Sequence, residues 1–367
     1  MILFKGQRDQ ILVPLQAVCG IVEKRHTLPI LSNVLIEKDA QKLTLLATDI
    51  EIQITTQTPT VGEDKVSLTV AARKLQDILR SLPEQLEVTL SLDERRLHLK
   101  AGKSKFNLQT LPAEDFPRMS LAESQSTRLK ITQSQMKRLL GLVQYAMAQQ
   151  DIRYYLNGLL LITKDNELRM VTTDGHRLAY ASETMAAPLS PIEVILPRKT
   201  ILELSRQLSD SDDPLEIALS PTQVLFKFSN IELVSKLIDG KFPDYDRVIP
   251  KHHTKLIKLN KSQFLQCLLR AAILTNEKFR GVRIVLAAGS LKIISSNNEQ
   301  EEAQEEIEID YSGEALDLGF NVTYLLDVLN NISSETIELH LADANSSALF
   351  ILPENKNFKY VVMPMRI

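Results

Sequence analysis

The chain contains three similar segments at a spacing of about 125 residues, and this repeat constrains its fold more than any single motif. Each copy has an apolar-periodic helix pattern, then a strand with a polar turn, then a second short helix pattern. The strand-and-turn strings are LTLLATDIEI from Leu43, LRMVTTDGHRLAY from Leu168 and LKIISSNNEQEE from Leu291. A chain of 367 residues can hold three such units, each with its own core. We therefore predict domains at 1–126, 127–251 and 252–367.

The pattern within each repeat predicts an α+β fold. Runs that alternate apolar and polar residues, such as SNVLIEK and EIQITTQ, are typical of antiparallel strands with one exposed face. Two helices and several strands per repeat indicate helices packed on antiparallel sheets. Three like units joined head to tail curve in one sense, so they form an open arc or part of a closed ring. An arc with two unpaired ends would close by dimerising.

The formal net charge of -3 conceals an uneven distribution between the predicted helices and the rest of the chain. If the helices share one face, that face is basic and suits a polyanion, although basic helix residues can also be ordinary solvated surface. No zinc-finger or basic-zipper pattern occurs, so contact with double-stranded DNA would be through phosphates and independent of sequence. Net positive charge is predicted for the helical segments 8–25, 73–82, 132–153, 198–206 and 261–283. The segment 320–331 has one charged residue, Asp327, and is therefore negative.

Cysteine and histidine usage argues against disulfides and metal sites. Cys19 and Cys267 both fall within apolar helix periodicity, which predicts buried thiols and a reducing compartment. The six histidines have no metal-ligand spacing, so we expect no cofactor and no metal. The chain also lacks a signal-peptide pattern and an apolar run of about 18 residues. We therefore expect a cytoplasmic protein with no membrane partner.

Two features could suggest catalysis, but both have a simpler structural interpretation. The string TTDGH places Asp174 beside His176, yet an Asp-Gly turn is also what a hairpin requires. The acidic run Glu299 to Asp310 lacks the spacing of a calcium loop and is typical of a charged sheet edge. We predict no catalytic residue. The alternatives are a metal-dependent phosphodiesterase acting on DNA through these groups, and a monomeric peptide-binding scaffold, which the basic helices argue against.

Several strings closely resemble the bacterial beta sliding clamp family, the processivity subunit of the replicative DNA polymerase. They are TTDGHRLA, LIDGKFPDYDRVIP, AAILTNEKFRGVR and the terminal YVVMPMRI, together with LPIL, TDIE and TLPAEDFP, and they extend over the whole chain. The resemblance implies the DNA clamp fold: three copies of one domain, and a head-to-tail homodimer that forms a six-domain ring with helices lining the hole. It implies a non-enzymatic protein that encircles duplex DNA and tethers the polymerase.

The resemblance also implies which residues face the DNA and which bind partners. Partners would be the catalytic subunit of the replicative polymerase, the clamp loader, and other DNA polymerases and repair proteins, all docking short peptides in one groove. DNA would contact Arg25, Arg73, Arg80, Gln150, Tyr154, Tyr155, Arg198 and Lys199. The groove would be lined by Leu156, Thr173, Gly175, His176, Arg177, Leu178, Pro243, Arg247, Val248, Asn321, Tyr324, Asn345, Ser347, Val361, Val362, Met363, Pro364, Met365 and Arg366.

The implied dimer interface brings a basic strand of one protomer against an acidic run of its partner. The chain departs from the family pattern at Ile367, in place of a terminal leucine, and at Gln304, in place of an acid. Lys103 and Lys105 also stand where the family commonly has arginine. An arginine can bind a carboxylate through two hydrogen bonds, whereas a lysine offers a point charge. The predicted interface residues are Lys74, Lys103, Lys105, Phe106, Ile273, Leu274, Glu299, Glu301, Glu302 and Glu305.

Overall fold

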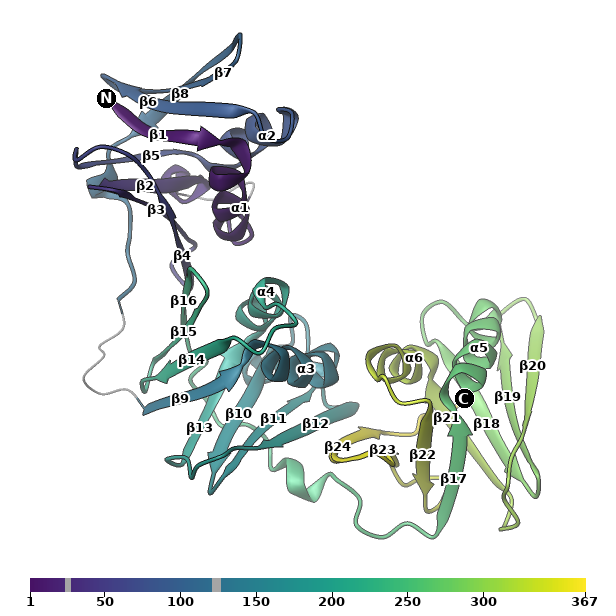
Figure 1. The fold of residues 1–367 in the computed structure, drawn as a ribbon. Helices are drawn as coiled ribbons and strands as arrows, with labels where there is room; N and C mark the ends of the chain where they lie inside the picture. The colour runs from purple at the N-terminus through teal and green to yellow at the C-terminus, as the bar shows by residue number, and fades with distance from the viewer. Residues whose placement is uncertain (24–27, 121–126) are drawn as a thin grey trace. The chain divides into compact units, whose positions relative to one another are not determined.

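The computed structural model describes residues 1–23, 28–120 and 127–367 (Figure 1). These residues form two compact units, each made of two stretches of chain: Met1–Gln135 with Leu202–Leu237, and Met136–Ile201 with Ile238–Ile367. Arg25, one of the predicted DNA contacts, lies outside the described residues. No helix in the described part of the chain is long and apolar enough to cross a membrane.

The first unit is built on one twelve-stranded sheet with the strand order β1-β6-β7-β8-β5-β2-β3-β4-β16-β15-β14-β9. Helices α1 (Arg8–Cys19) and α2 (Ala72–Ser81) pack against each other, and α1 also packs on β3 and β4. The strands are β1 (Ile2–Gln7), β2 (Asn33–Asp39), β3 (Lys42–Thr48), β4 (Ile52–Pro59), β5 (Val66–Ala71), β6 (Glu87–Asp93), β7 (Arg96–Ala101), β8 (Ser104–Leu111), β9 (Thr127–Thr132), β14 (Pro214–Leu219), β15 (Gln223–Phe228) and β16 (Ile231–Lys236).

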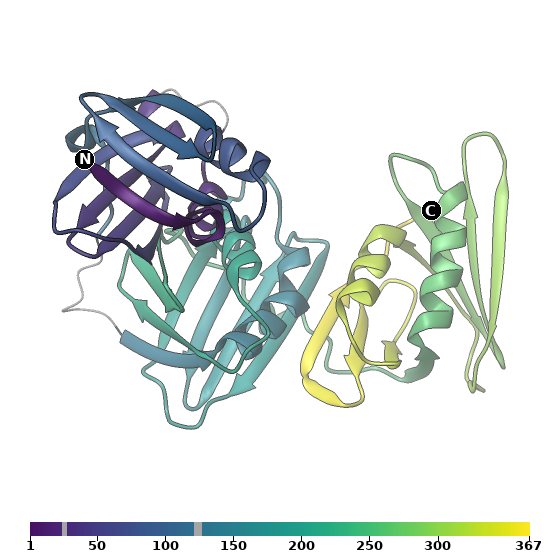
Figure 2. The ribbon, with the colours of Figure 1, turned by 45° about the horizontal axis from the view of Figure 1, so that its top comes forward.

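The second unit contains an eight-stranded sheet, β13-β10-β11-β12-β24-β23-β22-β17, and a four-stranded sheet, β20-β19-β18-β21. Helices α5 (Lys261–Ala271) and α6 (Val322–Asn331) pack against each other, as Figure 2 shows. Helix α3 is Gln133–Val143, and α4 is Arg198–Gln207. The strands are β10 (Gly158–Lys164), β11 (Glu167–Thr173), β12 (Arg177–Thr184), β13 (Ile192–Pro197), β17 (Lys255–Asn260), β18 (Gly281–Ala287), β19 (Ser290–Ser296), β20 (Glu302–Glu308), β21 (Leu316–Asn321), β22 (Thr336–Leu341), β23 (Ala348–Leu352) and β24 (Asn355–Val362).

The local sequence explains these elements. Along α1 the apolar residues Ile11, Leu15 and Val18 recur at helical spacing, and all three are fully buried. Cys19 and Cys267 are free and buried, which confirms the prediction of buried thiols. Burial raises the pKa of the Cys19 thiol to about 12, so the thiol stays protonated and unreactive.

The sheet topology confirms three copies of one fold, each with two helices. Each repeat contributes two sets of four strands in the same order: β1-β6-β7-β8 with β5-β2-β3-β4, β9-β14-β15-β16 with β13-β10-β11-β12, and β17-β22-β23-β24 with β21-β18-β19-β20. Consecutive repeats share a sheet through the last strand of each set. We call the pairing of β4 with β16 the first junction and that of β12 with β24 the second junction.

The predicted extent of three helical segments was wrong. Helix α1 ends at Cys19, α3 at Val143 and α5 at Ala271, because tighter turns follow; after α5 the Thr275 hydroxyl donates to the Ala272 carbonyl and closes such a turn. Arg153, Lys278 and Arg280 therefore lie in loops, and Arg283 lies on β18. The Arg8–Asp9 ion pair leaves α1 neutral, whereas α2, α3, α4 and α5 remain net basic.

Candidate functional sites

A tight turn, residues 173–177, connects β11 and β12 at the second junction. The Asp174 carboxylate accepts the backbone N–H groups of His176 (2.9 Å) and Arg177 (3.1 Å). The Thr173 hydroxyl accepts the Gly175 N–H at 3.0 Å, and Gly175 has φ +91°, a left-handed conformation that favours glycine. Asp174 therefore serves as a structural hydrogen-bond acceptor in this turn, which supports the hairpin interpretation of TTDGH over acid–base chemistry.

Arg177 lies at the centre of a mostly buried polar network, with a side chain only 9% exposed. Its guanidinium donates to the carboxylates of Asp174 (3.1 Å) and Asp327 (2.5 Å) and to the Tyr145 carbonyl (2.7 Å). It also lies over the Tyr324 ring at 4.4 Å. Burial opposes the charge, but Tyr360 and Asp327 outweigh it and raise the pKa of Arg177. The network joins the central repeat to α6 of the third repeat.

Two members of this network, Tyr145 and Asp327, were not among the predicted site residues. Asp327 gave a weak signal, because it is the only charged residue of α6. A lone acid on such a helix predicts a basic partner but does not identify it. The partner proved to be Arg177, which is 150 positions away in sequence.

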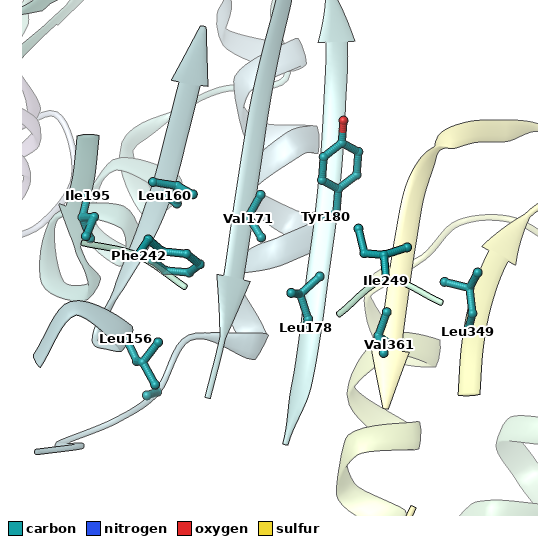
Figure 3. Close-up of a cluster of buried hydrophobic side chains, with 11 residues drawn as sticks. Leu156, Leu160, Val171, Leu178, Tyr180, Ile195, Phe242, Ile249, Leu349 and Val361 are labelled. Carbon is teal, nitrogen blue, oxygen red and sulfur yellow. The ribbon is translucent and has the colours of Figure 1, made fainter. Parts of the chain in front are cut away.

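An apolar cluster covers one face of the sheet at the second junction (Figure 3). Three of the predicted groove residues, Leu156, Leu178 and Val361, belong to it and are at most 2% exposed. The segment after β16 packs on the same face through Phe242 and Ile249. The remaining members are Ala148, Leu160, Val171, Tyr180, Ile195 and Leu349.

The C-terminal residues are attached to this region rather than frayed. Strand β24 ends at Val362, two residues before Pro364, which has no N–H to donate to a strand partner. The Met363 N–H donates to the His176 carbonyl at 2.9 Å. The Met365 N–H then donates to the Gly319 carbonyl at 2.8 Å. Met363 is still 48% exposed, so an apolar side chain remains open to solvent beside the cluster.

The other predicted groove residues lie in the same unit. Val248 is 44% exposed, and Arg247 forms an exposed ion pair with Asp244 at 2.9 Å. Asn321 caps α6 by accepting the Thr323 N–H at 2.9 Å, and the Tyr360 hydroxyl donates to the Tyr324 carbonyl. The residues in loops or at the chain end are Pro243, Asn345, Ser347, Pro364 and Arg366.

The predicted DNA contacts are placed on helices and one loop of the two units. Arg73 and Arg80 are exposed on α2, and the Arg73 guanidinium donates to the Val22 carbonyl at 2.5 Å. Arg198 and Lys199 begin α4. Burial and the nearby Arg177 lower the pKa of Arg198. Gln150 lies in the loop before β10, and Tyr154 and Tyr155 lie in the short 3-10 helix Tyr154–Leu156, where the two rings pack edge to face at 5.8 Å.

Four of the predicted interface residues lie on β8 and β20, and the other six lie outside these two strands. Lys105 and Phe106 are on β8, and Glu302 and Glu305 are on β20. Glu305 already forms an ion pair with Arg270 of the same chain at 2.6 Å. Ile273 is 76% exposed and helps line an open pocket of about 670 Å³ together with Phe279 and Glu299. Lys74 lies on α2, and Lys103 lies in the turn between β7 and β8. Leu274 follows α5, and Glu301 directly precedes β20.

Strand β20 forms the edge of the four-stranded sheet, which confirms the prediction of a charged sheet edge for the acidic run. Among the described residues, no group of three or more acidic, histidine or cysteine side chains could hold a metal ion.

Three family models match successive parts of the chain. They describe the N-terminal, central and C-terminal domains of the DNA polymerase III beta subunit and match residues 2–120, 130–244 and 246–366. The chain belongs to the beta sliding clamp family. It is thus a non-catalytic processivity factor of DNA polymerase III, and the alternative of a phosphodiesterase is set aside.

Full-length relatives show the same family. The chain is 47% identical over 374 residues to the beta sliding clamp of Pseudomonas putida, covering 99% of this chain and 100% of that protein. It is 42% identical over 365 residues to that of Escherichia coli K12, with the same coverage. A crystal structure of the DNA polymerase III subunit beta from Pseudomonas aeruginosa matches with a TM-score of 0.95 and 46% identity over the full length of both chains. A Pseudomonas aeruginosa clamp bound to griselimycin matches with a TM-score of 0.96 and 45% identity over the same extent.

Proposed function

We propose that two copies of this chain form a head-to-tail ring around double-stranded DNA in the bacterial cytoplasm. The ring slides without sequence preference and tethers polymerase III, the clamp loader and other replication and repair proteins through short peptides. The repeated strand topology is the observation that carries the proposal. Each chain holds two junctions between repeats, and the first and third repeats each have one further strand that could form a third junction.

The strands that would form this third junction are β20 and β8. In the repeat pattern β20 is the equivalent of β4 and β12, and β8 is the equivalent of β16 and β24. Strand β20 is an edge strand, and β8 pairs with β5 only at Leu111 and Thr110, so most of that edge of β8 has no strand partner among the described residues. Unpaired edges attract further strands. Pairing β20 of one protomer with β8 of its partner therefore closes the ring.

The existing junctions also predict the register of the third. In the first junction Ile231 lies opposite Thr56, and in the second Phe358 lies opposite Ala181. Thr56 and Ala181 each lie three positions after the first paired residue of β4 and β12. Glu305 lies three positions after Glu302, the first paired residue of β20. The first junction is the template for β8, because Ser104 and Ile231 are each the first paired residue after a hairpin turn. Strand β24 follows an irregular pairing, so Phe358 lies three positions after Asn355, its first paired residue. Ser104 of one protomer should therefore lie opposite Glu305 of the other, and Asn107 opposite Glu302.

The groove for partner peptides is proposed at the second junction. Leu178 and Val361 supply a buried apolar floor, and the exposed Val248 and Met363 supply apolar walls that a peptide can cover. Methionine adapts its shape to varied apolar side chains, which suits a surface with several partners. An extended segment with Leu and Phe anchors fits this chemistry.

The test combines a cross-link with the topology of the DNA. Asn107→Cys and Glu302→Cys together place two exposed thiols opposite each other across the proposed interface, whereas Cys19 and Cys267 are buried. After loading on circular DNA and oxidation, we expect a covalent dimer that resists high salt and is released when the DNA is linearised. Gln109→Cys with Glu302→Cys is the control, since its thiols are offset by two residues, about 7 Å along the strand.

Equal cross-linking of the two cysteine pairs would contradict the register. Loss of the covalent dimer from circular DNA at high salt would contradict the ring.

A further inference from the structure

The two junctions within the chain have the same backbone scaffold. At each junction, one row of residues that lie opposite one another runs across five neighbouring strands. The row starts at the last residue of β3 in the first junction and of β11 in the second. The row at the first junction is Thr48, Gln53, Val234, Leu225 and Ala218. The row at the second junction is Thr173, Leu178, Val361, Leu349 and His340. Gln53 therefore takes the place of Leu178, while Val234 and Leu225 correspond to Val361 and Leu349.

The turns and the strand ends are equivalent as well. Asp49 accepts the N–H groups of Glu51 (2.9 Å) and Ile52 (2.8 Å), as Asp174 does in the second junction. After the last paired strand, the Lys236 N–H donates to the Glu51 carbonyl at 2.9 Å. The Met363 N–H donates to the His176 carbonyl at the same distance. Glu51 therefore corresponds to His176, and Lys236 corresponds to Met363.

The side chains at these equivalent positions differ in polarity. At the second junction His176 and Met363 are exposed, and Leu178 lies in the apolar cluster. At the first junction the Lys236 ammonium forms an ion pair with Glu51 at 3.0 Å. A charged pair thus replaces an imidazole and a thioether on the same backbone.

Gln53 also holds a segment of the chain itself over the first junction. Its amide accepts the Met119 N–H at 2.7 Å and donates to the Met119 carbonyl at 3.1 Å, which satisfies both backbone groups of that residue. The Met119 side chain packs on Ala218, Leu225 and Val234. A peptide anchor that entered here would separate these groups and leave a buried amide unpaired, which is unfavourable.

We propose that the three side chains at these equivalent positions decide which junction accepts a partner peptide. Each protomer then offers one groove although it carries two copies of the scaffold. The inference rests on the proposed function, because the occupant is the same extended peptide with Leu and Phe anchors. The determining set at the second junction is His176, Leu178 and Met363, and its counterpart at the first is Glu51, Gln53 and Lys236.

A reciprocal exchange tests this proposal in the full-length dimer. The gain variant is Glu51→His, Gln53→Leu and Lys236→Met; the loss variant is His176→Glu, Leu178→Gln and Met363→Lys. A fluorescein-labelled synthetic peptide with one Leu and one Phe anchor is titrated, and native mass spectrometry counts bound peptides. We expect one peptide per protomer for the wild type, two for the gain variant and none for the loss variant.

The control removes a comparable ion pair that lies outside the two sets of equivalent positions, with its acid on β16. Lys227 and Glu232 face each other across β15 and β16 at 3.2 Å. The variant Lys227→Met with Glu232→His should keep one peptide per protomer. A gain in this control would show that added apolar surface alone binds the peptide, which would overturn the proposal.

The remaining outcomes separate this inference from the proposed function. Failure of the wild type to bind any peptide would contradict the proposed groove itself. A folded gain variant that stays at one peptide, beside a wild type that binds one, would overturn the inference alone. If the gain variant does not fold, the loss variant decides, since unchanged affinity there would also refute the role of these positions.

Discussion

The two junctions also differ on the opposite face of the shared strand. Ile52 lies opposite Ser235 and Arg177 lies opposite Val362, so the two residues have equivalent positions. Ile52 is 1% exposed and has no charge, whereas Arg177 is the hub of the buried network described above. Apolar contacts tolerate small rotations, but a guanidinium fork requires a fixed geometry. Strand pairing therefore builds both junctions, and at the second junction the side chain at this position also fixes α6 through a charged hydrogen bond.

The largest expected effect in this comparison comes from removing the hub. Arg177→Met leaves the carboxylate of Asp327 and the carbonyl of Tyr145, both in half-buried residues, without their partner. Breaking a buried ion pair typically costs about 3 to 5 kcal/mol. We expect the second unit to lose stability by roughly 3 kcal/mol. Urea unfolding, with hydrogen exchange of α6 as the local readout, measures it.

The matched control is the equivalent position of the first junction. Ile52→Val removes one methylene from a buried site, which costs about 0.5 to 1.5 kcal/mol. If Arg177→Met costs no more than Ile52→Val, or if exchange in α6 stays at the wild-type level, then the network does not hold the third repeat and the comparison fails.

A smaller effect is expected from the residue at the tip of each turn. Ile50 has φ +72° at the place where Gly175 has φ +91°. A left-handed conformation costs a residue with a Cβ about 1 to 2 kcal/mol, and a Cβ on Gly175 would also lie 3.0 Å from the Arg153 guanidinium. Gly175→Ala should therefore destabilise the second unit by about 1 to 2 kcal/mol. Thermal unfolding of the single variants measures the effect.

The opposite exchange should have the opposite sign. Ile50→Gly relieves the backbone, while the lost contacts of a side chain that is 41% exposed and the more flexible unfolded chain offset part of the gain. We expect net stabilisation by about 0.5 kcal/mol. Destabilisation by Ile50→Gly would mean that the first turn depends on its isoleucine side chain and differs from the second in more than backbone strain.

The sequence predicts those parts of the molecule that depend on local pattern. The repeat, the helix starts, the strand alternation and the hairpin at Asp174 all follow from residues close together in the chain, and the structure confirms them. The ends of α3 and α5 were predicted too late, because apolar residues continue into the turns that follow. The contact between Arg177 and Asp327 could not be predicted, because pairing between repeats brings the two residues together.

The last predicted effect concerns the third junction, between protomers. In the proposed register Gln304 lies opposite Lys105 of the partner, so a neutral amide faces a cation. Gln304→Glu would create a cross-strand ion pair, and exposed pairs of this kind contribute about 0.2 to 1 kcal/mol. We expect the dimer dissociation constant to fall by up to about fivefold at low salt, measured by sedimentation, and the gain to vanish at high salt.

The same substitution should have the opposite effect within a single chain. Residue 304 lies between Glu302 and Glu306 on one face of β20, so a third carboxylate adds repulsion within the chain, and a cation of the partner would relieve it. The variant should therefore lower the stability of the isolated protomer by a few tenths of a kcal/mol while it strengthens the dimer. In the Lys105→Gln background the gain in dimerisation should disappear. An equal gain in both backgrounds would place residue 304 opposite some other group and would contradict the register that the first two junctions predict for the third.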